Sequence, residues 1–224
     1  MDMGQVITID GPAASGKTSV SRELAKRMGW HWVSTGAFYR GLAYAAMRLS
    51  MDLTNEQQLA ELSMGNKWRV EMDEERTRVY FENEDITDQI AQEAVGNVAS
   101  KISHFPKVRE SLLQGQRRCQ AVTAGLIAEG RDCGTVVFPE AEIKIYLTAR
   151  SENRAERRAK EQGLSAESLI EAQTQRDLQD STRKAAPLQV PPNALLVDTT
   201  ELDFDQVVSL VEKHVKNSVS KSSH

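Results

Sequence analysis

The sequence predicts an α/β fold in which helices cover both faces of a parallel β-sheet. Short apolar segments alternate with amphipathic ones along most of the chain, which is the pattern of strands that alternate with helices. A glycine-rich phosphate-binding motif follows the first apolar segment. Two alternating segments between residues 68 and 82, separated by an acidic turn, read as a hairpin that interrupts this rhythm. The sequence therefore predicts one domain, 1–224, with an inserted subdomain that contains a small antiparallel sheet.

The individual elements follow from local patterns. Apolar runs predict strands of the main sheet at 5–10, 30–33, 125–129, 143–147 and 193–198, and the hairpin strands at 68–72 and 78–82. Apolar residues at helical spacing predict helices at 19–28, 37–49, from 54 onward, 88–103, 106–119, 151–162, 165–180 and 204–215. Thr54 and Gln57 form a capping-box pattern. The polar residues 216–224 predict a flexible tail.

The phosphate-binding motif has the spacing G-x-x-x-x-G-K-[ST] between a predicted strand and a predicted helix. Glycines allow successive backbone N–H groups to point inward, and the helix N-terminus adds partial positive charge. We expect Lys17 to reach the terminal phosphates and Thr18 to offer its hydroxyl to Mg²⁺. The segment predicted to bind a nucleoside triphosphate consists of Gly11, Pro12, Ala13, Ala14, Ser15, Gly16, Lys17, Thr18 and Ser19.

Composition excludes several classes of protein. The chain has 224 residues, 40% hydrophobic residues, 27% charged residues and a net charge of −4, which argues against broad nucleic-acid binding through a basic face. The two cysteines form no C-x-x-C motif and the four histidines have no ligand spacing, so no structural zinc site is indicated. No run approaches the roughly 20 apolar residues of a membrane-spanning helix, and a strand begins too early for a signal peptide. We therefore expect a soluble cytoplasmic protein.

Arginines are placed where the loops of the sheet should converge. An alcohol acceptor of a phosphoryl group usually needs a carboxylate base, whereas a phosphate acceptor needs positive charge that offsets the repulsion between two anions. Arginine suits the second task because its planar fork binds phosphate oxygens in pairs. Arg131 follows a buried strand and a glycine, and Arg183 precedes an irregular, proline-marked segment. Both positions favour a binding site over a solvated helix face.

Four strings, VITIDGPAASGKTSVSRELA, STGAFYRGLA, LIAEGRDCGTVVFP and RDLQDSTRKAAPL, occur in this order and resemble the bacterial cytidylate kinases. The resemblance extends to about Val215. It implies a P-loop fold of the nucleoside monophosphate kinase type, with a monophosphate-binding insertion at about 36–105 and a short helical lid at 150–164. It also implies transfer of the γ-phosphate of ATP to CMP or dCMP, with Mg²⁺. Separately, we expect the protein to be a monomer.

The resemblance implies roles for individual residues. Contacts to the CMP acceptor are expected from Thr35, Arg40, Ser100, Arg109, Arg131, Asp132, Arg176, Asp180 and Arg183. Among these, Ser100, Arg109 and Asp132 match cytosine-recognising positions, and Asp180 matches a ribose contact. In the lid, Arg154, Arg157 or Arg158 should close on the ATP phosphates, with Arg157 preferred. The catalytic set is then Lys17, Arg131, Arg157 and Arg183, while Glu129 either orients a magnesium-bound water or is purely structural.

Two alternatives remain open from the sequence. The first is a kinase of the same class with another acceptor, such as UMP or a small metabolite. The second is a nucleotide-dependent switch or a nucleic-acid-binding ATPase, which would hydrolyse ATP without an acceptor and bind DNA or RNA in a salt-sensitive way. The acidic balance and the dispersed arginines argue against the second alternative.

Overall fold

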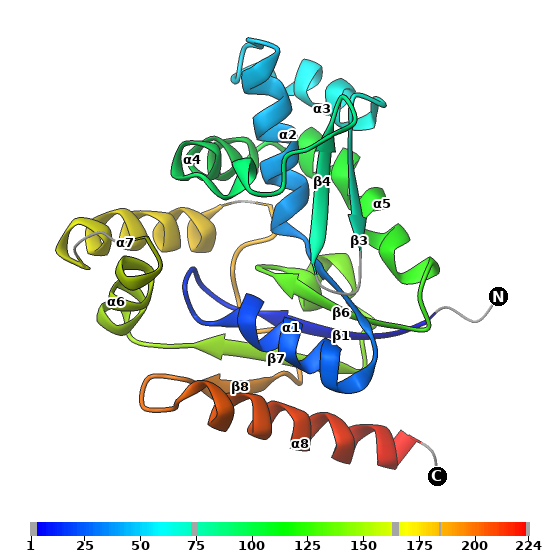
Figure 1. The fold of residues 1–224 in the computed structure, drawn as a ribbon, viewed down its shortest axis with the longest axis vertical. Helices are drawn as coiled ribbons and strands as arrows, with labels where there is room; N and C mark the ends of the chain where they lie inside the picture. Colours follow the sequence, from blue (N-terminus) through cyan, green and yellow to red (C-terminus); the bar gives the residue numbers. More distant parts are fainter. Residues whose placement is uncertain (1–3, 73–75, 163–165, 184, 223–224) are drawn as a thin grey trace.

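The fold is known from a computed structural model that describes residues 4–72, 76–162, 166–183 and 185–222; for 160–162, 166–169, 171–173, 176 and 219–222 it describes the backbone alone. The predicted fold class is confirmed, because strands and helices alternate around a parallel sheet (Figure 1). The described helices are α1 (Lys17–Met28), α2 (Gly36–Arg48), α3 (Glu56–Met64), α4 (Glu93–Ile102), α5 (Pro106–Ala121), α6 (Ser151–Gln162), α7 (Ala166–Thr182) and α8 (Phe204–Ser222).

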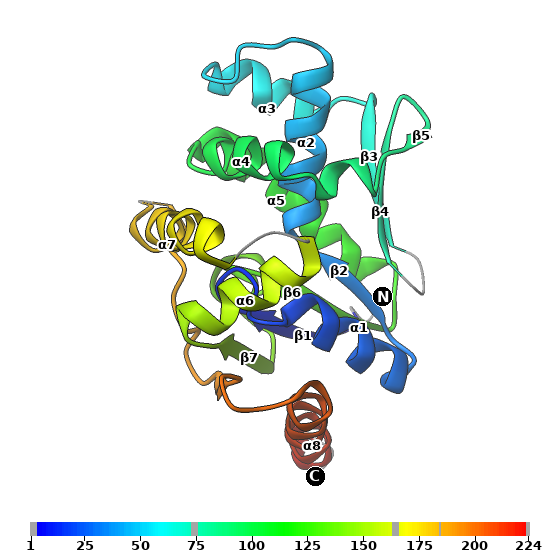
Figure 2. The ribbon, with the colours of Figure 1, turned by 60° about the vertical axis from the view of Figure 1, so that its left-hand side comes forward.

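The main sheet has five parallel strands in the order β2-β6-β1-β7-β8. Their bounds are β1 (Gln5–Asp10), β2 (His31–Ser34), β6 (Gly125–Gly130), β7 (Ile143–Thr148) and β8 (Leu195–Asp198). Strand β1 lies at the centre, between β6 and β7, and is buried from its second residue to its last. The carboxyl ends of the strands face α6 and α7 (Figures 1 and 2). Ligands of open parallel sheets bind at this edge.

Helices cover both faces of the sheet because successive residues of each buried strand point to opposite faces. Ile7 and Ile127 belong to one apolar cluster, together with residues of α1, α8 and strands β7 and β8. Val6 and Leu126 belong to another, with α2, α4, α5 and the small sheet. Leu24 of α1 is fully buried in the first cluster. The core is therefore two apolar layers, one on each side of the sheet.

The predicted insertion is a compact unit above the main sheet (Figure 1). It contains an antiparallel sheet of β3 (Trp68–Met72), β4 (Thr77–Phe81) and β5 (Glu84–Asp85), which packs against α2. The hairpin prediction is confirmed, but β5 was not predicted. Glu82 and Asn83 join β4 to β5 with φ angles of 47° and 70°, the left-handed conformation that a two-residue hairpin turn requires.

Two helix predictions in the insertion were wrong in detail. The cap of α3 is Asn55, whose side chain accepts a hydrogen bond from the backbone N–H of Gln58, and not Thr54. The hydroxyl of Thr54 instead donates to Asp52 Oδ1 at 2.7 Å. The predicted helix 88–103 is broken at Gln92, which has ψ = 145°, into the short helix η1 (Gln89–Ala91) and α4. The first difference arises because neighbouring side chains compete for the capping bonds. The second arises because Gln92 adopts an extended conformation.

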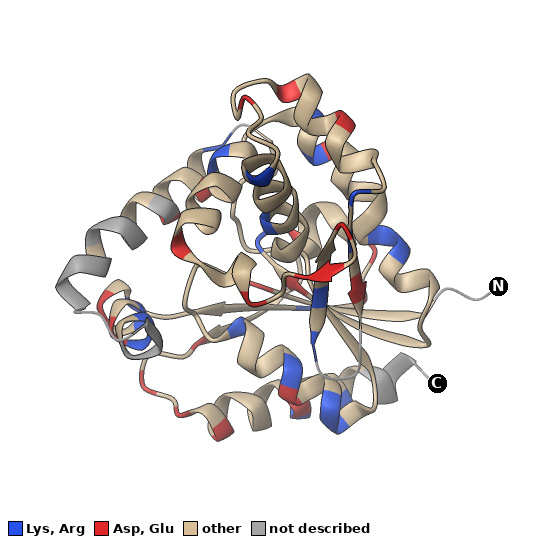
Figure 3. Ribbon diagram, turned by 45° about the horizontal axis from the view of Figure 1, so that its top comes forward, with Lys and Arg blue, Asp and Glu red and all other residues tan. Residues whose placement is uncertain are grey.

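The carboxyl-terminal part also differs from prediction at element ends. Helix α8 continues to Ser222, past the predicted end at Val215, and α7 continues to Thr182. One element was missed altogether, the single-turn π-helix η2 (Cys133–Val137) directly after Asp132. Basic and acidic residues are interspersed along the outer helices in the view of Figure 3. Within the described ranges, none of the helices combines the length and apolar character that crossing a bilayer requires.

Candidate functional site: a phosphate loop facing an arginine and aspartate wall

The phosphate loop connects the end of β1 to the start of α1. Gly11 has φ = 150° and a Cβ there would lie 2.0 Å from the backbone oxygen of Leu147, so only glycine fits. Gly16 precedes the helix with φ = 87°, and Ala14 also has a positive φ of 55°. These conformations turn the backbone into a concave loop at the N-terminus of α1. Such a loop is an anion-binding cradle.

Lys17 lies at the base of the loop and is only 6% exposed. Its Nζ donates to the backbone oxygen of Pro12 at 2.6 Å and to Ser15 Oγ at 3.5 Å. Burial, together with the positive charge of Arg131, lowers the pKa of the ammonium to about 7. The nearby carboxylates of Glu129 and Asp10 act in the opposite direction. The charge of Lys17 is therefore poorly compensated and would be stabilised by a bound polyphosphate.

A set of oxygen groups lies beside the loop, at the end of β6. The hydroxyl of Thr18 donates to Glu129 Oε1 at 3.2 Å, and the hydroxyl of Thr35 donates to the backbone oxygen of Glu129 at 3.0 Å. The register places Glu129 opposite Ile9, one residue before the end of β1. Hydroxyl and carboxylate oxygens suit Mg²⁺, which usually keeps several waters and uses one or two carboxylates with substrate phosphates. Within the described residues, no three His, Cys, Asp or Glu side chains gather as a metal-binding group.

Arginine and aspartate side chains alternate across from the loop. Arg131 donates from Nε to Asp180 Oδ2 at 2.7 Å and from Nη1 to the backbone oxygen of Gly11 at 2.8 Å. Arg183 Nη1 lies 3.7 Å from Asp180 Oδ1, and its Nη2 lies 3.8 Å from Asp132 Oδ1. Asp132 also forms an ion pair with Arg109. Among the residues that the structure describes, buried Arg183 Nη2 has no hydrogen-bond partner, so this wall keeps donor capacity for an anion.

These groups line a cavity of 620 Å³ between the main sheet, the insertion and α6 and α7. It brings together most of the residues predicted to bind ATP and most of those predicted to bind CMP. Those among its lining residues are Ala13, Ala14, Ser15, Gly16, Lys17, Thr18, Ser19, Thr35, Arg40, Ser100, Glu129, Arg131, Asp132, Arg158, Asp180 and Arg183. Arg40 is held at the cavity by donating from Nη1 to the backbone oxygen of Ile90 at 2.6 Å.

Three predicted arginines whose side chains the structure describes are not among the lining residues. Arg109 lies behind Asp132 and over the ring of Tyr39, with 5.5 Å between its Cζ and the ring centroid. Arg154 donates to the backbone oxygen of Ala13 at 3.1 Å, which ties α6 to the phosphate loop. Arg157, the preferred lid arginine, donates instead to Thr199. The structure therefore does not bring Arg157 to the cavity.

Of the three arginines predicted for a lid, Arg158 is the one that lines the cavity, and it forms an ion pair with Glu93 at the start of α4. Successive residues of a helix point about 100° apart, so its neighbour Arg157 faces β8. Arg176 lies on α7, but its side chain is outside the described part of the structure. The two remaining loop residues, Gly11 and Pro12, lie just behind the cavity lining and contribute backbone oxygens to Arg131 and Lys17.

Two site residues were missed from the sequence. Asp10, the last residue of β1, is fully buried and accepts backbone N–H bonds from Cys133 at 2.8 Å and from Gly134 at 2.7 Å. Burial raises its pKa to about 6, although the two N–H bonds lower it. Tyr39 lines the cavity, and burial raises its pKa to about 12. A carboxylate directly before the glycine loop was the available signal for Asp10.

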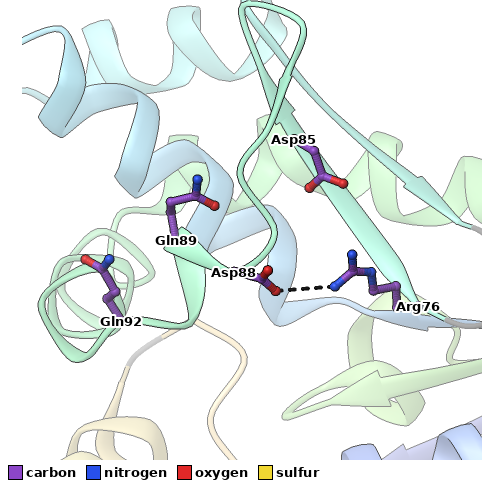
Figure 4. A pocket seen from close by; sticks show the side chains of 5 residues that line it. All are labelled: Arg76, Asp85, Asp88, Gln89 and Gln92. Atoms are coloured by element: carbon purple, nitrogen blue, oxygen red, sulfur yellow. Dashed lines mark hydrogen bonds and ion pairs between the residues drawn. The ribbon is translucent and has the colours of Figure 1, made fainter.

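A second recess, of 430 Å³, lies in the insertion beside the small sheet (Figure 4). Its lining consists of Arg76, Asp85, Asp88, Gln89 and Gln92. Arg76 Nη1 and Asp88 Oδ1 form an ion pair at 3.3 Å across it. None of the predicted site residues is among those that line this recess, so the candidate site is the larger cavity.

Comparisons with known proteins agree with this geometry. A family model described as cytidylate kinase matches residues 7–217. A cytidylate kinase from Bdellovibrio bacteriovorus is 64% identical over 217 residues, which cover 97% of this chain and 100% of the relative. One from Azotobacter vinelandii is 45% identical over 217 residues, with 94% of each chain covered. A gluconokinase structure from Sinorhizobium meliloti covers 99% of this chain and 98% of its own, at a TM-score of 0.51 and 13% identity, and supports the fold alone. The chain belongs to the cytidylate kinase family.

Proposed function

We propose that this chain transfers the γ-phosphate of ATP to CMP or dCMP, forming ADP and CDP or dCDP. Family membership supports the reaction class. The single observation that carries the acceptor assignment is the position of Asp132, which forms ion pairs with Arg109 and Arg183. Asp132 lines the same cavity as the phosphate loop. The three side chains offer a carboxylate for a nucleobase amino group and guanidinium groups for a phosphate.

On the donor side, the loop from Gly11 to Ser19 would hold the ATP phosphates through backbone N–H groups. Lys17 would leave Pro12 and turn its ammonium to the terminal phosphates, where it counters the charge on the transferring group. Thr18 would bind Mg²⁺ with its hydroxyl, and Glu129 would hold a water of the metal. Magnesium, when bound with the nucleotide, neutralises phosphate charge. The oxygen donors of these two residues fit that ion.

On the acceptor side, Arg131, Arg183 and Arg176 would hold the CMP phosphate in line with the γ-phosphate. The acceptor is itself an anion, so no general base is needed, and positioning with positive charge lowers the barrier. Asp180 would accept from the ribose hydroxyls while it orients Arg131 and Arg183. Thr35 and Arg40 would complete the contacts to the monophosphate from the first turns of α2.

Recognition of cytosine would rest on Asp132, Arg109 and Ser100. Asp132 can accept a hydrogen from the amino group of cytosine, whereas uracil has an oxygen at that place. Arg109 has five N–H donors, of which its bonds to Asp132 and to the backbone oxygen of Ser103 use two. In this proposal Arg109, which lies behind Asp132, would turn its remaining donors toward acceptors on the base when CMP binds. A buried carboxylate facing an oxygen would discriminate against uracil.

We infer that residues 36–105 form the acceptor-binding insertion and that α6 within 150–164 is the lid. Two contacts of α6 support this: Arg154 donates a hydrogen bond to the phosphate loop, and Arg158 forms an ion pair with Glu93. The same helix therefore contacts both the donor loop and the insertion. Closure over the nucleotides would exclude water and limit ATP hydrolysis. We also propose that the protein is a monomer and binds neither nucleic acid nor membrane. We place it in the cytoplasm, where the two free, buried cysteines would stay reduced.

The test is a comparison of initial rates with CMP, dCMP, UMP and AMP at equal concentration, with ATP and Mg²⁺. The proposal expects CDP and dCDP formation to exceed UDP formation by at least about 100-fold, since a buried polar mismatch discriminates strongly. A faster rate with UMP would overturn the role of Asp132. ATP hydrolysis that needs no acceptor, together with salt-sensitive binding of DNA or RNA, would favour the nucleotide-switch alternative.

A further inference from the structure

We propose that Gln179 determines which nucleobase the cavity accepts, by fixing the hydroxyl of Ser100 as a hydrogen-bond acceptor. This inference rests on the proposed function and deepens it. Gln179 is not proposed to touch the substrate. It acts through Ser100 and is therefore a positioning residue.

The geometry is a single hydrogen bond between two helices. Ser100 lies on α4 of the insertion, and Gln179 lies on α7 next to the lid. The hydroxyl of Ser100 donates to Gln179 Oε1 at 3.1 Å. Both side chains are half-buried, and Ser100 lines the cavity together with Asp132. The hydroxyl of the neighbouring Ser103 donates to the backbone oxygen of Ser100 at 2.7 Å and therefore does not occupy Gln179 Oε1.

A serine hydroxyl has one proton and two lone pairs. When that proton is used on Gln179, the hydroxyl can only accept from a group in the cavity. Ser100 and Asp132, which both line the cavity, then both present acceptors to it. The amino group of cytosine has two hydrogens, one for each of these acceptors, whereas the corresponding oxygen of uracil would face two oxygens and no donor.

Removal of the Gln179 amide oxygen would release the Ser100 hydroxyl from its fixed role as an acceptor, without removing Ser100 itself. The hydroxyl would be free to rotate and could donate its proton to the uracil oxygen. Cytosine would keep Asp132 as its main partner, so use of CMP would fall only slightly. Because a buried polar group without a partner is strongly unfavourable, relief of one such mismatch should raise the kcat/KM for UMP about tenfold.

The experiment uses the full chain and measures kcat/KM for CMP and for UMP. Gln179→Met keeps the length of the side chain and removes the acceptor, and Gln179→Glu keeps an acceptor at the same distance. Gln175→Met is the matched control, because Gln175 lies one turn earlier on α7 and is exposed. We expect the ratio of UMP to CMP kcat/KM to rise about tenfold in Gln179→Met. The ratio should stay at the wild-type value in the other two variants.

A double-variant comparison separates this role from a structural one. In a Ser100→Ala background, Gln179→Met should leave the UMP to CMP ratio unchanged, since the hydroxyl it acts on is gone. An unchanged ratio in Gln179→Met, or the same rise in the Ser100→Ala background, would overturn the inference. So would a change in KM for ATP alone. Absence of CDP formation by the wild-type chain would instead overturn the proposed function, so the two failures are distinguishable.

Discussion

Binding of ATP near pH 8 should take up almost one proton, because the charge state of Lys17 differs between the free protein and the nucleotide complex. Burial and the charge of Arg131 lower the pKa of this ammonium to about 7. A polyphosphate in the loop would lie within contact distance and favour the charged form, as an opposite charge does for any buried cation. The perturbation is therefore simply the addition of MgATP at a chosen pH.

The magnitude follows from the pKa of the free protein. With a pKa of about 7, only about one tenth of the molecules carry a charged Lys17 at pH 8, and about half do at pH 7. If the bound nucleotide restores the ordinary value of 10.5, binding takes up about 0.9 proton at pH 8 and about 0.5 at pH 7. The phosphate groups do not obscure this uptake at pH 8, because their second pKa is about 6.

Isothermal titration calorimetry in two buffers with different ionisation enthalpies measures the proton uptake directly. The matched control is Lys17→Arg, whose guanidinium stays charged at every pH, titrated at concentrations above its own Kd. Uptake should vanish in this variant and fall toward zero at pH 6 in the wild type. Uptake below about 0.3 proton at pH 8, or equal uptake in Lys17→Arg, would refute the assigned state of Lys17.

Three further predictions concern the cavity and the core. Asp132→Asn should lower kcat/KM for CMP by at least about tenfold while the Kd for ATP, measured by calorimetry, stays within about twofold; an unchanged CMP to UMP ratio would contradict the recognition role. Asp10→Asn should remove a pH dependence of stability: the folded state holds its proton to about pH 6 and the unfolded state only to 3.8, so a rise in pH across this window destabilises the wild type by up to about 3 kcal/mol. Urea unfolding of both proteins from pH 4 to 7 measures this, and parallel curves would disprove it. Leu24→Ala should lower the free energy of unfolding by about 3 kcal/mol at neutral pH, because this side chain is fully buried under the sheet; a loss below about 1 kcal/mol in urea titrations would contradict the core assignment.

Much of the fold could be predicted because the strands of a parallel sheet are short, buried and apolar. Ile7 and Ile127 lie in such apolar runs. Turn residues at the ends of these runs separate them clearly from the helices. Errors arose where two local solutions compete within a few residues. Thr54 and Asn55 can both cap a helix, and the choice was decided by Asp52, which takes the Thr54 hydroxyl. Such contests differ by small energies that a sequence pattern does not reveal.

The site shows the same division. Arg131 and Arg183 converge on the cavity, as their places at loop and strand ends predicted. Asp132 joins them there, at a position that only the family resemblance had indicated. Arg157 does not, because the rotation of α6 about its own axis depends on how it packs, and one residue of phase moves a side chain by about 100°. Asp10 could not be assigned a partner from sequence, because it bonds backbone N–H groups more than a hundred residues away and any residue but proline offers such a group.

The central place of β1 has a consequence for the order of events on the ribosome. Both hydrogen-bonding neighbours of this first strand, β6 and β7, end far downstream, at residues 130 and 148. Until they emerge, β1 has no partner within the sheet, and its apolar side chains have no sheet to pack in. Synthesis at about 5–20 residues per second would leave β1 waiting for roughly 10 seconds. The nascent chain therefore exposes an unpaired strand for longer than most of its other elements, and we expect it to be the segment that molecular chaperones protect.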